Sequence, residues 1–307
     1  MIVCFDIGGT AIKGAAAYAA DDVRPLARQQ TPIHDFNAFV SVLKSAIAEI
    51  DGTPECVALS ITGIIDPDTG KSFIANIPCA HQRPLKADLE AALGLPVLIA
   101  NDADCCALAE YGVGAGRGHR VVFSAILGTG VGGALVIDGK LINSGGGFAG
   151  EWGHAPVAAT RAGNPPVDLP RFACGCGLDG CLDAICSARG MEKLHRHLTG
   201  KAMAAEEILE SWQAGEVDAT RTIDIYIDML SGPLALVVNV TGTTIIPVGG
   251  GLSNSSALLE ALDQAVRARI LRRFTRPLVV RAECTIEPGL VGAAVLGFDF
   301  VRQRSAR

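Results

Sequence analysis

The chain has 307 residues, of which 49% are hydrophobic and 19% charged, and its formal net charge is −6 at pH 7. This length allows two domains of ordinary size, each with its own core, and the composition is far from that of a disordered chain. The acidic balance argues against nucleic acid or an anionic membrane surface as a partner.

Neither secretion nor membrane insertion is expected. Asp6 interrupts the first apolar run, which argues against a signal peptide. Two long uncharged stretches, 121–137 and 230–259, are interrupted by glycines or prolines and lack the pattern of a membrane span. We therefore expect a cytoplasmic protein, and the ten cysteines are not expected to form a disulfide framework.

The first element expected is a β-hairpin around a glycine turn. Residues 2–5 predict a buried strand and residues 11–17 its return, with Asp6-Ile7-Gly8-Gly9-Thr10 between them. Glycines allow several backbone N–H groups to converge on a phosphate. A tight hairpin whose glycines only supply positive φ is the alternative.

Strands and helices then alternate along the first half. Strands are expected at 25–30, 56–61 and 97–100, and helices at 36–50, 85–93 and 103–111. This alternation predicts an α/β domain with a substantially parallel sheet. The glycine-rich segment 112–118 is the expected domain boundary or hinge.

The second half opens like the first. Residues 121–127 predict a strand, Gly128–Gly133 a glycine turn, and 134–137 a return strand. The turn fits G-x-G-x-x-G, but a dinucleotide site needs a helix directly after it, and a strand is expected instead. The repeat of strand, glycine turn and strand suggests two domains of similar design.

The remaining elements follow a third glycine turn and several amphipathic patterns. Strands are expected at 245–248 and 278–281, the third glycine turn at 249–253, and helices at 187–198, 205–212, 219–238, 258–271 and 290–301. The last helix is expected to return to the first domain.

Four residues have the composition of a metal site. Cys174, Cys176 and Cys181 lie close together among glycines, and His154 precedes them, which makes a plausible tetrahedral Cys3His set. Three buried or redox-active cysteines are the alternative. Because four protein ligands leave no open position, we expect a structural zinc ion rather than a catalytic one.

Six motifs, in this order along nearly the whole chain, resemble the ROK family of sugar kinases and repressors. They are Asp6-Ile-Gly-Gly-Thr10, Asn101-Asp102-Ala103, Leu127-Gly-Thr-Gly-Val-Gly-Gly133, Glu151-x-Gly-His154, Cys174-Gly-Cys-Gly-x-x-Gly-Cys181 and Gly249-Gly-Gly-Leu-Ser253. The resemblance implies an actin-like, hexokinase-like (ribonuclease H-like) α/β fold of two domains with an inter-domain cleft. Residues 1–115 with 290–307 would form the smaller domain, and 116–289 the larger.

The resemblance also implies a reaction. Ala75-Asn76-Ile77-Pro78 and Pro84-Leu85-Lys86-Ala87-Asp88-Leu89 are most similar to the N-acetyl-D-glucosamine kinases of the family. ATP-dependent phosphorylation of an N-acetylated hexosamine is therefore expected, most closely N-acetyl-D-glucosamine at its 6-hydroxyl. Glucose or N-acetylmannosamine as the substrate, a non-catalytic sugar sensor, and an actin-like ATPase without a small substrate are the alternatives. A homodimer is implied as well, and the DNA-binding module of the family's repressors is not expected before a first strand at residue 2.

For the phosphate transfer, the resemblance assigns Asp102 as the general base and Asp6 to Mg²⁺. Asp102 follows a buried strand, where ligand sites of open α/β sheets lie, although capping of the next helix is an alternative role for it. The residues assigned to ATP besides Asp6 are Gly8, Gly9, Thr10, Gly128, Thr129, Gly130, Val131, Gly132, Gly133, Gly250 and Gly251.

For the sugar, the resemblance assigns Asn101, Glu151, His154, Asp183, Gly63 and Asn76. His154 would bind zinc through one ring nitrogen and face the sugar with the other. Two positions depart from the family. Asp183 stands where a glutamate is usual and is one methylene shorter; a direct sugar contact, a contact bridged by water and a surface carboxylate without a sugar contact are the alternatives. Ala11 stands where lysine is common, and Lys13, on the same face of the strand, could supply that charge.

Overall fold

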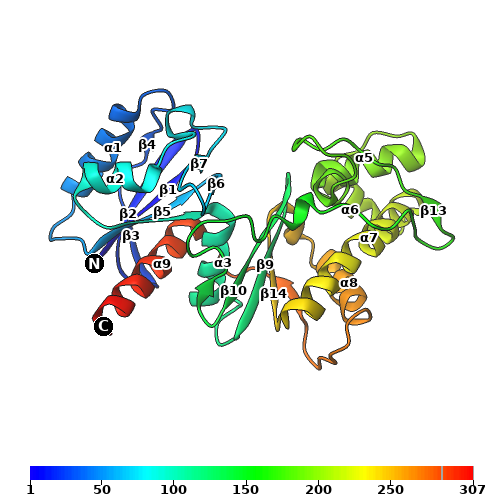
Figure 1. Ribbon diagram of the computed structural model, residues 1–307. Helices are drawn as coiled ribbons and strands as arrows, with labels where there is room; N and C mark the ends of the chain where they lie inside the picture. Colours follow the sequence, from blue (N-terminus) through cyan, green and yellow to red (C-terminus); the bar gives the residue numbers. More distant parts are fainter. Residues whose placement is uncertain (285, 307) are drawn as a thin grey trace. The chain divides into compact units, whose positions relative to one another are not determined.

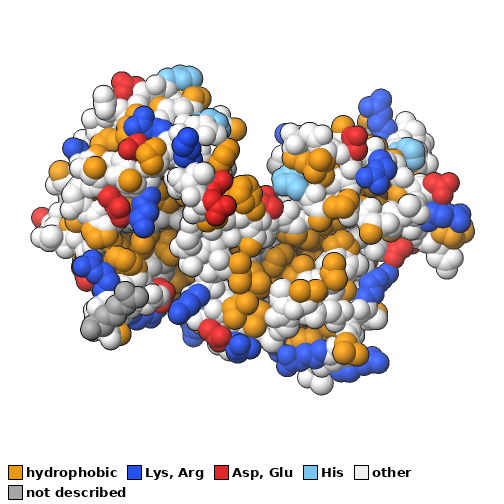
Figure 2. All heavy atoms as spheres, viewed as in Figure 1, with side chains coloured by type: hydrophobic (Ala, Val, Ile, Leu, Met, Phe, Trp, Pro, Cys, Tyr) orange, Lys and Arg blue, Asp and Glu red, His pale blue; other side chains and the backbone are white. Residues whose placement is uncertain are grey.

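The structure, a computed structural model, describes residues 1–284 and 286–306, and its chain divides into two compact units (Figure 1). The first unit comprises Met1–Arg117, Val136–Ala149 and Cys284–Arg307, and the second comprises Gly118–Leu135 and Gly150–Glu283. Each unit contains a mixed β-sheet with helices packed against it. Figure 2 shows lysine and arginine side chains on the surfaces of both units, with acidic side chains among them.

The sheet of the first unit is six-stranded, in the order β3-β2-β1-β5-β8, with β4 also paired to β2. The strands are β1 (Ile2–Ile7), β2 (Ala11–Ala19), β3 (Asp22–Pro25), β4 (Gln29–Gln30), β5 (Cys56–Ile61) and β8 (Val97–Asn101). β1 is antiparallel to β2 and parallel to β5, which is in turn parallel to β8. β5 is buried along its whole length because both faces of a parallel sheet are covered.

Helices cover the two faces of this sheet. α1 (Phe36–Ala48) and α2 (Leu85–Leu93) share a core with Val3, Phe5 and Ile7 of β1. Alternate residues of a strand point to opposite faces, so Ile2 and Asp6 face the other side, where they contact α9 (Pro288–Ser305). α9 also packs along α3 (Asp102–Gly112). The short elements of this unit are β6 (Ile64–Ile65), β7 (Ser72–Phe73), β11 (Lys140–Leu141) and the 3-10 turn η1 (Pro78–Ala80).

In the second sheet the strands lie side by side in the order β11-β10-β9-β14-β15, and all of them except β11 and the end of β10 belong to the second unit. The strands are β9 (Val121–Leu127), β10 (Val131–Ile137), β14 (Ile246–Gly249) and β15 (Val279–Arg281). β14 is parallel to both β9 and β15. The other elements are β12 (Arg161–Ala162), β13 (Val167–Asp168), α4 (Leu182–Cys186), α5 (Ala188–Thr199), α6 (Ala205–Gln213), α7 (Val217–Thr241), α8 (Ser256–Arg267), η2 (Trp152–His154) and η3 (Gly251–Asn254).

α7 is the central helix of this core. Within the described residues it is the one helix long and apolar enough to cross a membrane, yet half of its most apolar window is buried. Ile223, Tyr226 and Leu230 belong to the core of the second unit, and the Tyr226 hydroxyl donates to the carbonyl oxygen of Cys186 at 2.7 Å. Its apolar composition is therefore that of a core helix.

Most of the expected elements are confirmed, with small shifts at their ends. The single strand expected at 25–30 is wrong: the chain forms β3 and β4, two short strands that pair with different parts of β2. α8 ends at Arg267, before the expected 271, and α4 was not expected because its five residues are too short for a periodic pattern. β10 begins at Val131, inside the expected glycine turn.

The two units differ from the expected domains in residues 116–117, 136–149 and 284–289, which group with the first unit. The Asn143 amide nitrogen lies 3.4 Å from both carboxylate oxygens of Asp104 on α3. It also donates to the carbonyl oxygen of Ala149 at 2.6 Å. The contact between Asn143 and Asp104 joins side chains that are far apart in sequence, so composition around 112–118 could not reveal it.

Candidate active site

Three strands of the first unit end at the same edge of the sheet. Ile7 is paired with Ile61, and Ile61 is paired with Asn101, so the three strands finish in one row. The residues that follow them are therefore Gly8, Thr62 and Asp102. The carboxyl ends of parallel strands are where open α/β sheets bind their ligands.

A cavity of about 550 Å³ opens at this edge. It brings together five residues that the sequence assigned to the site, namely Asp6, Gly8, Gly9, Thr10 and Asp102. Arg28, Cys106 and Glu287 also line it and were not predicted. Of these three residues, only Glu287 lies at a position that the sequence marks: the next residue, Pro288, is a proline of the kind that favours the first turn of a helix, here α9.

Asp6 is held in a fixed position beneath the glycine turn. The hydroxyl group of Ser60 on the neighbouring strand donates to Asp6 Oδ1 at 2.9 Å. A Cβ atom on Gly289 would lie 2.5 Å from the same oxygen, so the N-terminus of α9 packs directly against the carboxylate. The unpaired N–H groups at a helix N-terminus favour negative charge, which suits both this carboxylate and a bound phosphate.

Lys13 and Ala11 both line the cavity, as the two-residue period of a strand predicts. The Lys13 Nζ atom lies 2.7 Å from Glu287 Oε2 and 3.8 Å from Asp6 Oδ2. The side chains of Lys13 and Glu287 are about one third exposed, so solvent partly screens this pair. The lysine therefore sits beside the glycine turn with its ammonium group between two carboxylates.

Asn101 and Asp102 begin α3. Asn101 is the N-cap: its Oδ1 accepts from Ala103 N at 2.8 Å, and its Nδ2 donates to the carbonyl oxygen of Gly63 at 2.8 Å. Gly63 has φ +109°, and a side chain there would overlap the carbonyl oxygen of Phe73. Asn101 thus occupies the N-cap position, and Asp102 is the first helical residue, on the wall of the cavity. Asp102 Oδ1 also accepts from Ala103 N, at 2.9 Å.

Asn76 connects this edge to the glycine turn. Its Nδ2 donates to Thr62 Oγ1 at 3.2 Å, and its carbonyl oxygen would lie 3.0 Å from a Cβ atom on Gly9. The segment predicted to contact sugar and the turn predicted to contact phosphate are therefore neighbours.

In the second unit, the other two glycine turns also follow adjacent parallel strands, β9 and β14. The Cα atom of Gly250 and the nitrogen of Gly251 would each lie 3.6 Å from a Cβ atom on Gly128. Gly250 has φ +87°, and a side chain there would overlap the carbonyl oxygen of Leu127. The residues predicted to bind phosphate and adenosine in this half thus form one continuous backbone surface.

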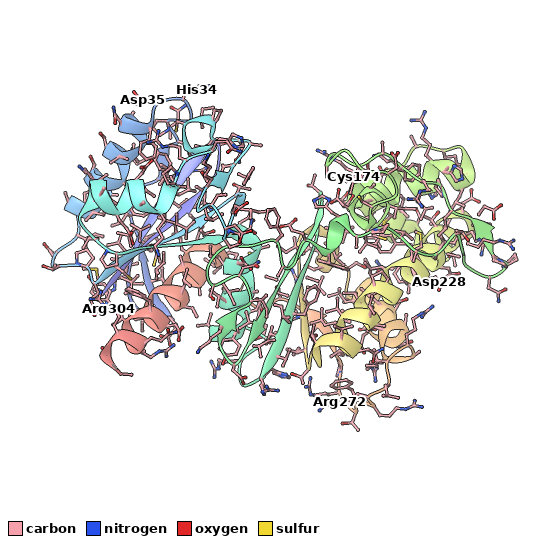
Figure 3. All side chains as sticks on the ribbon, viewed as in Figure 1. His34, Asp35, Cys174, Asp228, Arg272 and Arg304 are labelled. Atoms are coloured by element: carbon pink, nitrogen blue, oxygen red, sulfur yellow. The ribbon has the colours of Figure 1, made fainter. Side chains whose placement is uncertain are left out.

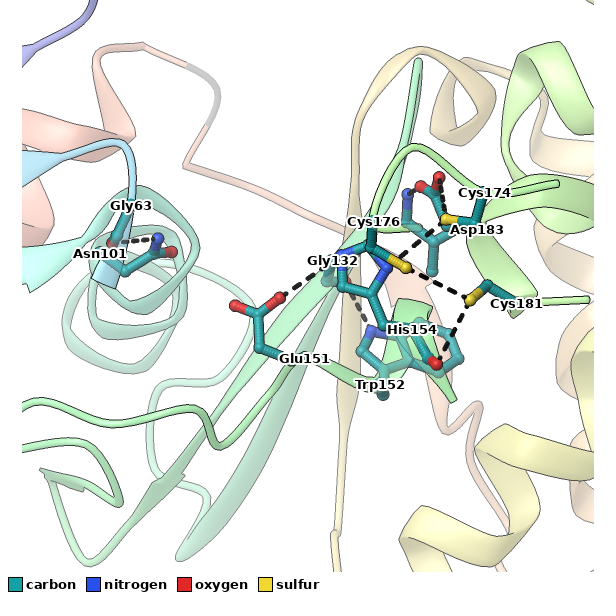
Figure 4. Close-up of polar contacts among 11 residues, drawn as sticks. Gly63, Asn101, Gly132, Glu151, Trp152, His154, Cys174, Cys176, Cys181 and Asp183 are labelled. Carbon is teal, nitrogen blue, oxygen red and sulfur yellow. Dashed lines mark hydrogen bonds and ion pairs between the residues drawn. The ribbon is translucent and has the colours of Figure 1, made fainter. Parts of the chain in front are cut away.

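His154, Cys174, Cys176 and Cys181 form a compact cluster, with one ligand atom of each lying within 4.8 Å of the others. Figure 3 labels Cys174, and Figure 4 shows the contacts of the cluster. The sulfur atoms of Cys176 and Cys181 are 3.7 Å apart, and Cys174 Sγ is 3.7 Å from His154 Nδ1. Zinc–sulfur bonds of about 2.3 Å in a tetrahedron place two sulfurs about 3.8 Å apart. The donor set and its spacing therefore fit zinc.

The thiols of this cluster ionise differently. A hydrogen bond from the backbone N–H of Leu178 lowers the pKa of the Cys176 thiol, whereas burial raises the pKa of Cys181 to about 12. Metal binding requires thiolates, so an ion must offset the cost of deprotonating the buried Cys181.

The side chains of Glu151 and His154 are each about two fifths exposed and lie beside one another (Figure 4). His154 directs Nδ1 to Cys174 and Nε2 to Glu151, with 3.8 Å between Nε2 and Glu151 Oε2. One ring nitrogen thus faces the Cys174 thiol and the other faces the Glu151 carboxylate. Asp183 points elsewhere: its Oδ1 accepts from the backbone N–H of Val131 at 2.7 Å.

Two α/β units, each with a glycine turn directly after a buried sheet strand, have the architecture of actin-like ATPases. The model of the ROK family matches residues 2–299, and this chain belongs to the ROK family. It is a sugar kinase of that family, as both its relatives and the solved structures indicate.

Two relatives share about a third of its residues. An N-acetylgalactosamine kinase from Shewanella sp. (strain ANA-3) is 36% identical over 95% of both chains. An N-acetyl-D-glucosamine kinase from Pasteurella multocida (strain Pm70) is 35% identical over 95% of this chain and 97% of the relative. The family resemblance expected from the motifs is confirmed.

Solved structures confirm the expected fold class. The ROK hexokinase from Thermus thermophilus has a TM-score of 0.82 at 29% identity and covers 98% of this chain and 99% of its own. A ROK glucokinase from Streptomyces griseus, solved with glucose and AMPPNP, has a TM-score of 0.69 at 26% identity and the same coverage.

Proposed function

We propose that this enzyme transfers the γ-phosphate of ATP to the 6-hydroxyl of N-acetyl-D-glucosamine. The observation that carries the proposal is the cavity of the first unit, where Asp102 and the Asp6–Thr10 turn share one edge of the sheet. The relatives named as kinases of N-acetylated hexosamines support this class of substrate. Within the class, the segments 75–78 and 84–89 support N-acetyl-D-glucosamine.

Asp102 acts as the general base in this proposal. Its carboxylate accepts the proton of the sugar 6-hydroxyl as that oxygen attacks the γ-phosphorus, and ADP leaves with the electrons of the broken bond. Asn101 sets the start of α3 and hence the position of Asp102. An amide carries two N–H groups, and with one bonded to Gly63 the other serves a sugar hydroxyl.

The phosphates are neutralised by backbone N–H groups and a cation. Gly8, Gly9 and Thr10 contact the distal phosphates, while the carboxylate of Asp6, an oxygen ligand, suits Mg²⁺ through water. Magnesium, when bound, would offset the charge of the β- and γ-phosphates. Gly128–Gly133 hold phosphates in the second unit, and Gly250 and Gly251 lie near adenosine.

In the second unit, the residues proposed to bind sugar hydroxyls are Glu151 and His154. In the first unit, they are Gly63 and Asn76, together with Asn101. Zinc held by His154 and the three cysteines fixes the ring orientation of His154. From the family resemblance we propose that the protein is cytoplasmic and forms a homodimer. Size-exclusion chromatography with light scattering would test the dimer.

A substrate panel tests the proposed function. We expect kcat/KM to be at least about tenfold higher for N-acetyl-D-glucosamine than for N-acetylgalactosamine, N-acetylmannosamine or glucose, a difference of about 1.4 kcal/mol. A coupled ADP-release assay with each sugar measures this. The relative from Shewanella makes N-acetylgalactosamine the second candidate, and a preference for it would overturn the assignment. Sugar binding without ADP release would instead support a non-catalytic sensor.

Lys13 provides a second test, because its ammonium group lies beside the phosphate turn where Ala11 carries no charge. Loss of a charge-assisted hydrogen bond to phosphate in Lys13→Met should raise KM for ATP about tenfold, while Lys13→Arg stays within a few-fold of wild type. Steady-state kinetics at saturating sugar measures both, with Lys44→Met on the exposed side of α1 as the control. An unchanged KM for ATP in Lys13→Met would exclude a phosphate contact.

A further inference from the structure

The carboxylate of Asp183 lies between the metal cluster and the second phosphate turn. Asp183 is in the first turn of α4, two residues after Cys181. Its Oδ1 accepts from Val131 N at 2.7 Å, and its Oδ2 is 3.9 Å from Cys174 Sγ (Figure 4). A Cβ atom on Gly130 would lie 2.9 Å from Oδ1, so the carboxylate packs directly on the turn.

Two further hydrogen bonds join the same turn to residues that flank the cluster. The indole Nε1 of Trp152, two residues before His154, donates to the carbonyl oxygen of Gly132 at 2.7 Å. The backbone N–H of Ala188, at the start of α5, donates to the carbonyl oxygen of Gly128 at 2.8 Å. The turn is therefore bonded at Gly128, Val131 and Gly132.

The segment that carries His154 also packs against the turn without intervening side chains. A Cβ atom on Gly153 would overlap the carbonyl oxygen of Val131, so only glycine allows this approach. Within the turn, Gly128 N donates to Gly130 O at 3.0 Å, and the strands β9 and β10 on either side of it are paired. The residues around the metal cluster add three hydrogen bonds to these contacts and so contribute to the conformation of the turn.

We propose that Asp183 is a positioning residue for the phosphate turn at 128–133, and that the metal cluster holds this turn in its nucleotide-binding shape through Asp183, Trp152 and α5. The proposal rests on the proposed function, because it takes the turn to bind the phosphates of ATP. In this proposal Asp183 holds the turn instead of making the expected sugar contact, because its Oδ1 accepts a hydrogen bond from Val131 N. It also assigns the Val131 N–H to Asp183 rather than to a phosphate.

Three variants of Asp183 distinguish a role in positioning the phosphate turn from a role in binding sugar. Asp183→Ala removes the acceptor for Val131 N, whereas Asp183→Asn keeps a carbonyl oxygen that can accept the same hydrogen bond. Asp183→Glu adds one methylene and shifts the acceptor. Asp179→Ala, on the exposed part of the same cysteine segment, is the matched control.

The measurement is the Kd of ADP by isothermal titration calorimetry without sugar, together with KM for ATP and for sugar. Asp183→Ala should weaken ADP binding and raise KM for ATP about tenfold, with kcat and the sugar KM changed far less. Asp183→Asn should stay within about threefold of wild type, since the accepting oxygen is retained. Zinc content and melting temperature show whether Asp183→Ala folds. If it does not, Asp183→Glu takes its place, and we expect this variant to weaken ADP binding as well.

Two results would overturn the proposal. One is an Asp183→Ala protein that folds, keeps its zinc and binds ADP as wild type does. The other is a change confined to the sugar KM, which would return Asp183 to the sugar site. A wild-type protein that binds no ADP would instead contradict the proposed function itself.

Discussion

Replacement of Asp102 by asparagine should reduce kcat by about 10²–10⁴-fold, the range that a general base contributes. Asparagine has nearly the same size but does not accept the proton of an attacking hydroxyl at neutral pH. The fold should persist, because Asn101 caps α3 through Ala103 N and Gly63 O, and an asparagine side-chain oxygen can accept from Ala103 N as Asp102 Oδ1 does. Sugar affinity should therefore change no more than a few-fold, which calorimetric titration of the sugar measures beside the kinetics.

The matched control for this variant is Asp51→Asn, an exposed aspartate of the first unit beyond the end of α1. It should retain wild-type turnover. An Asp102→Asn enzyme with substantial kcat would refute the role of Asp102 as the general base. Catalysis would then rest on the glycine turns and the cations, which stabilise the charge of the transition state. Loss of sugar binding along with turnover would point to a disrupted site instead.

The second large effect is expected for Cys176→Ser, which removes one thiol of the metal cluster. The energy of binding a structural zinc ion is energy of folding, so loss of one ligand should lower both zinc content and melting temperature. The Leu178 N–H lowers the pKa of the Cys176 thiol, whereas burial raises the pKa of Cys181, so the Cys176 thiolate forms more readily than that of Cys181. Elemental analysis of the purified protein and differential scanning calorimetry provide the two readouts.

Cys79→Ser is the control for this variant. Cys79 lies outside the cluster, and its thiol donates to the carbonyl oxygen of Pro32 at 3.3 Å, a bond that a serine hydroxyl can also make. This protein should keep both zinc and melting temperature. Stoichiometric zinc and an unchanged melting temperature in Cys176→Ser would remove Cys176 from the ligand set.

The outcome of the metal experiment also bears on the phosphate turn. If the cluster positions residues 128–133, zinc loss should weaken ADP binding in the protein that remains folded, and added zinc should restore it. The hydrogen bonds from Trp152 and Ala188 supply a direct route for this effect, since both end on the turn. Activity assays alone would not distinguish this effect from a loss of sugar binding through His154.

Local patterns predicted the strands and helices of this chain well. β5, α2 and β9 have the expected bounds, because an uninterrupted apolar run or a helical repeat is visible within a short window. The pairing of short strands was not visible in this way. β3 and β4 contain no apolar run that distinguishes them, and their separation depends on which part of β2 each one meets.

The sequence by itself determined the chemical groups of the site and their place at strand ends. Glycine turns follow β1 and β9, Asp102 follows β8, and three cysteines lie within one short segment, all features set by neighbours along the chain. Which of these groups meet was decided by the tertiary structure. The common row of Ile7, Ile61 and Asn101 aligns the ends of three strands, and it arises from hydrogen bonds between segments far apart in sequence.

Side-chain partners were decided in the same way. The position of Lys13 on a strand predicted the face it occupies, but its pairing with Glu287 required α9 to return to the first unit. The family resemblance assigned Asp183 to the sugar, whereas its hydrogen bond to Val131 N is visible only in the tertiary structure. Sequence periodicity reports on neighbours along the chain, whereas a hydrogen-bond partner is set by the packing of whole strands and helices.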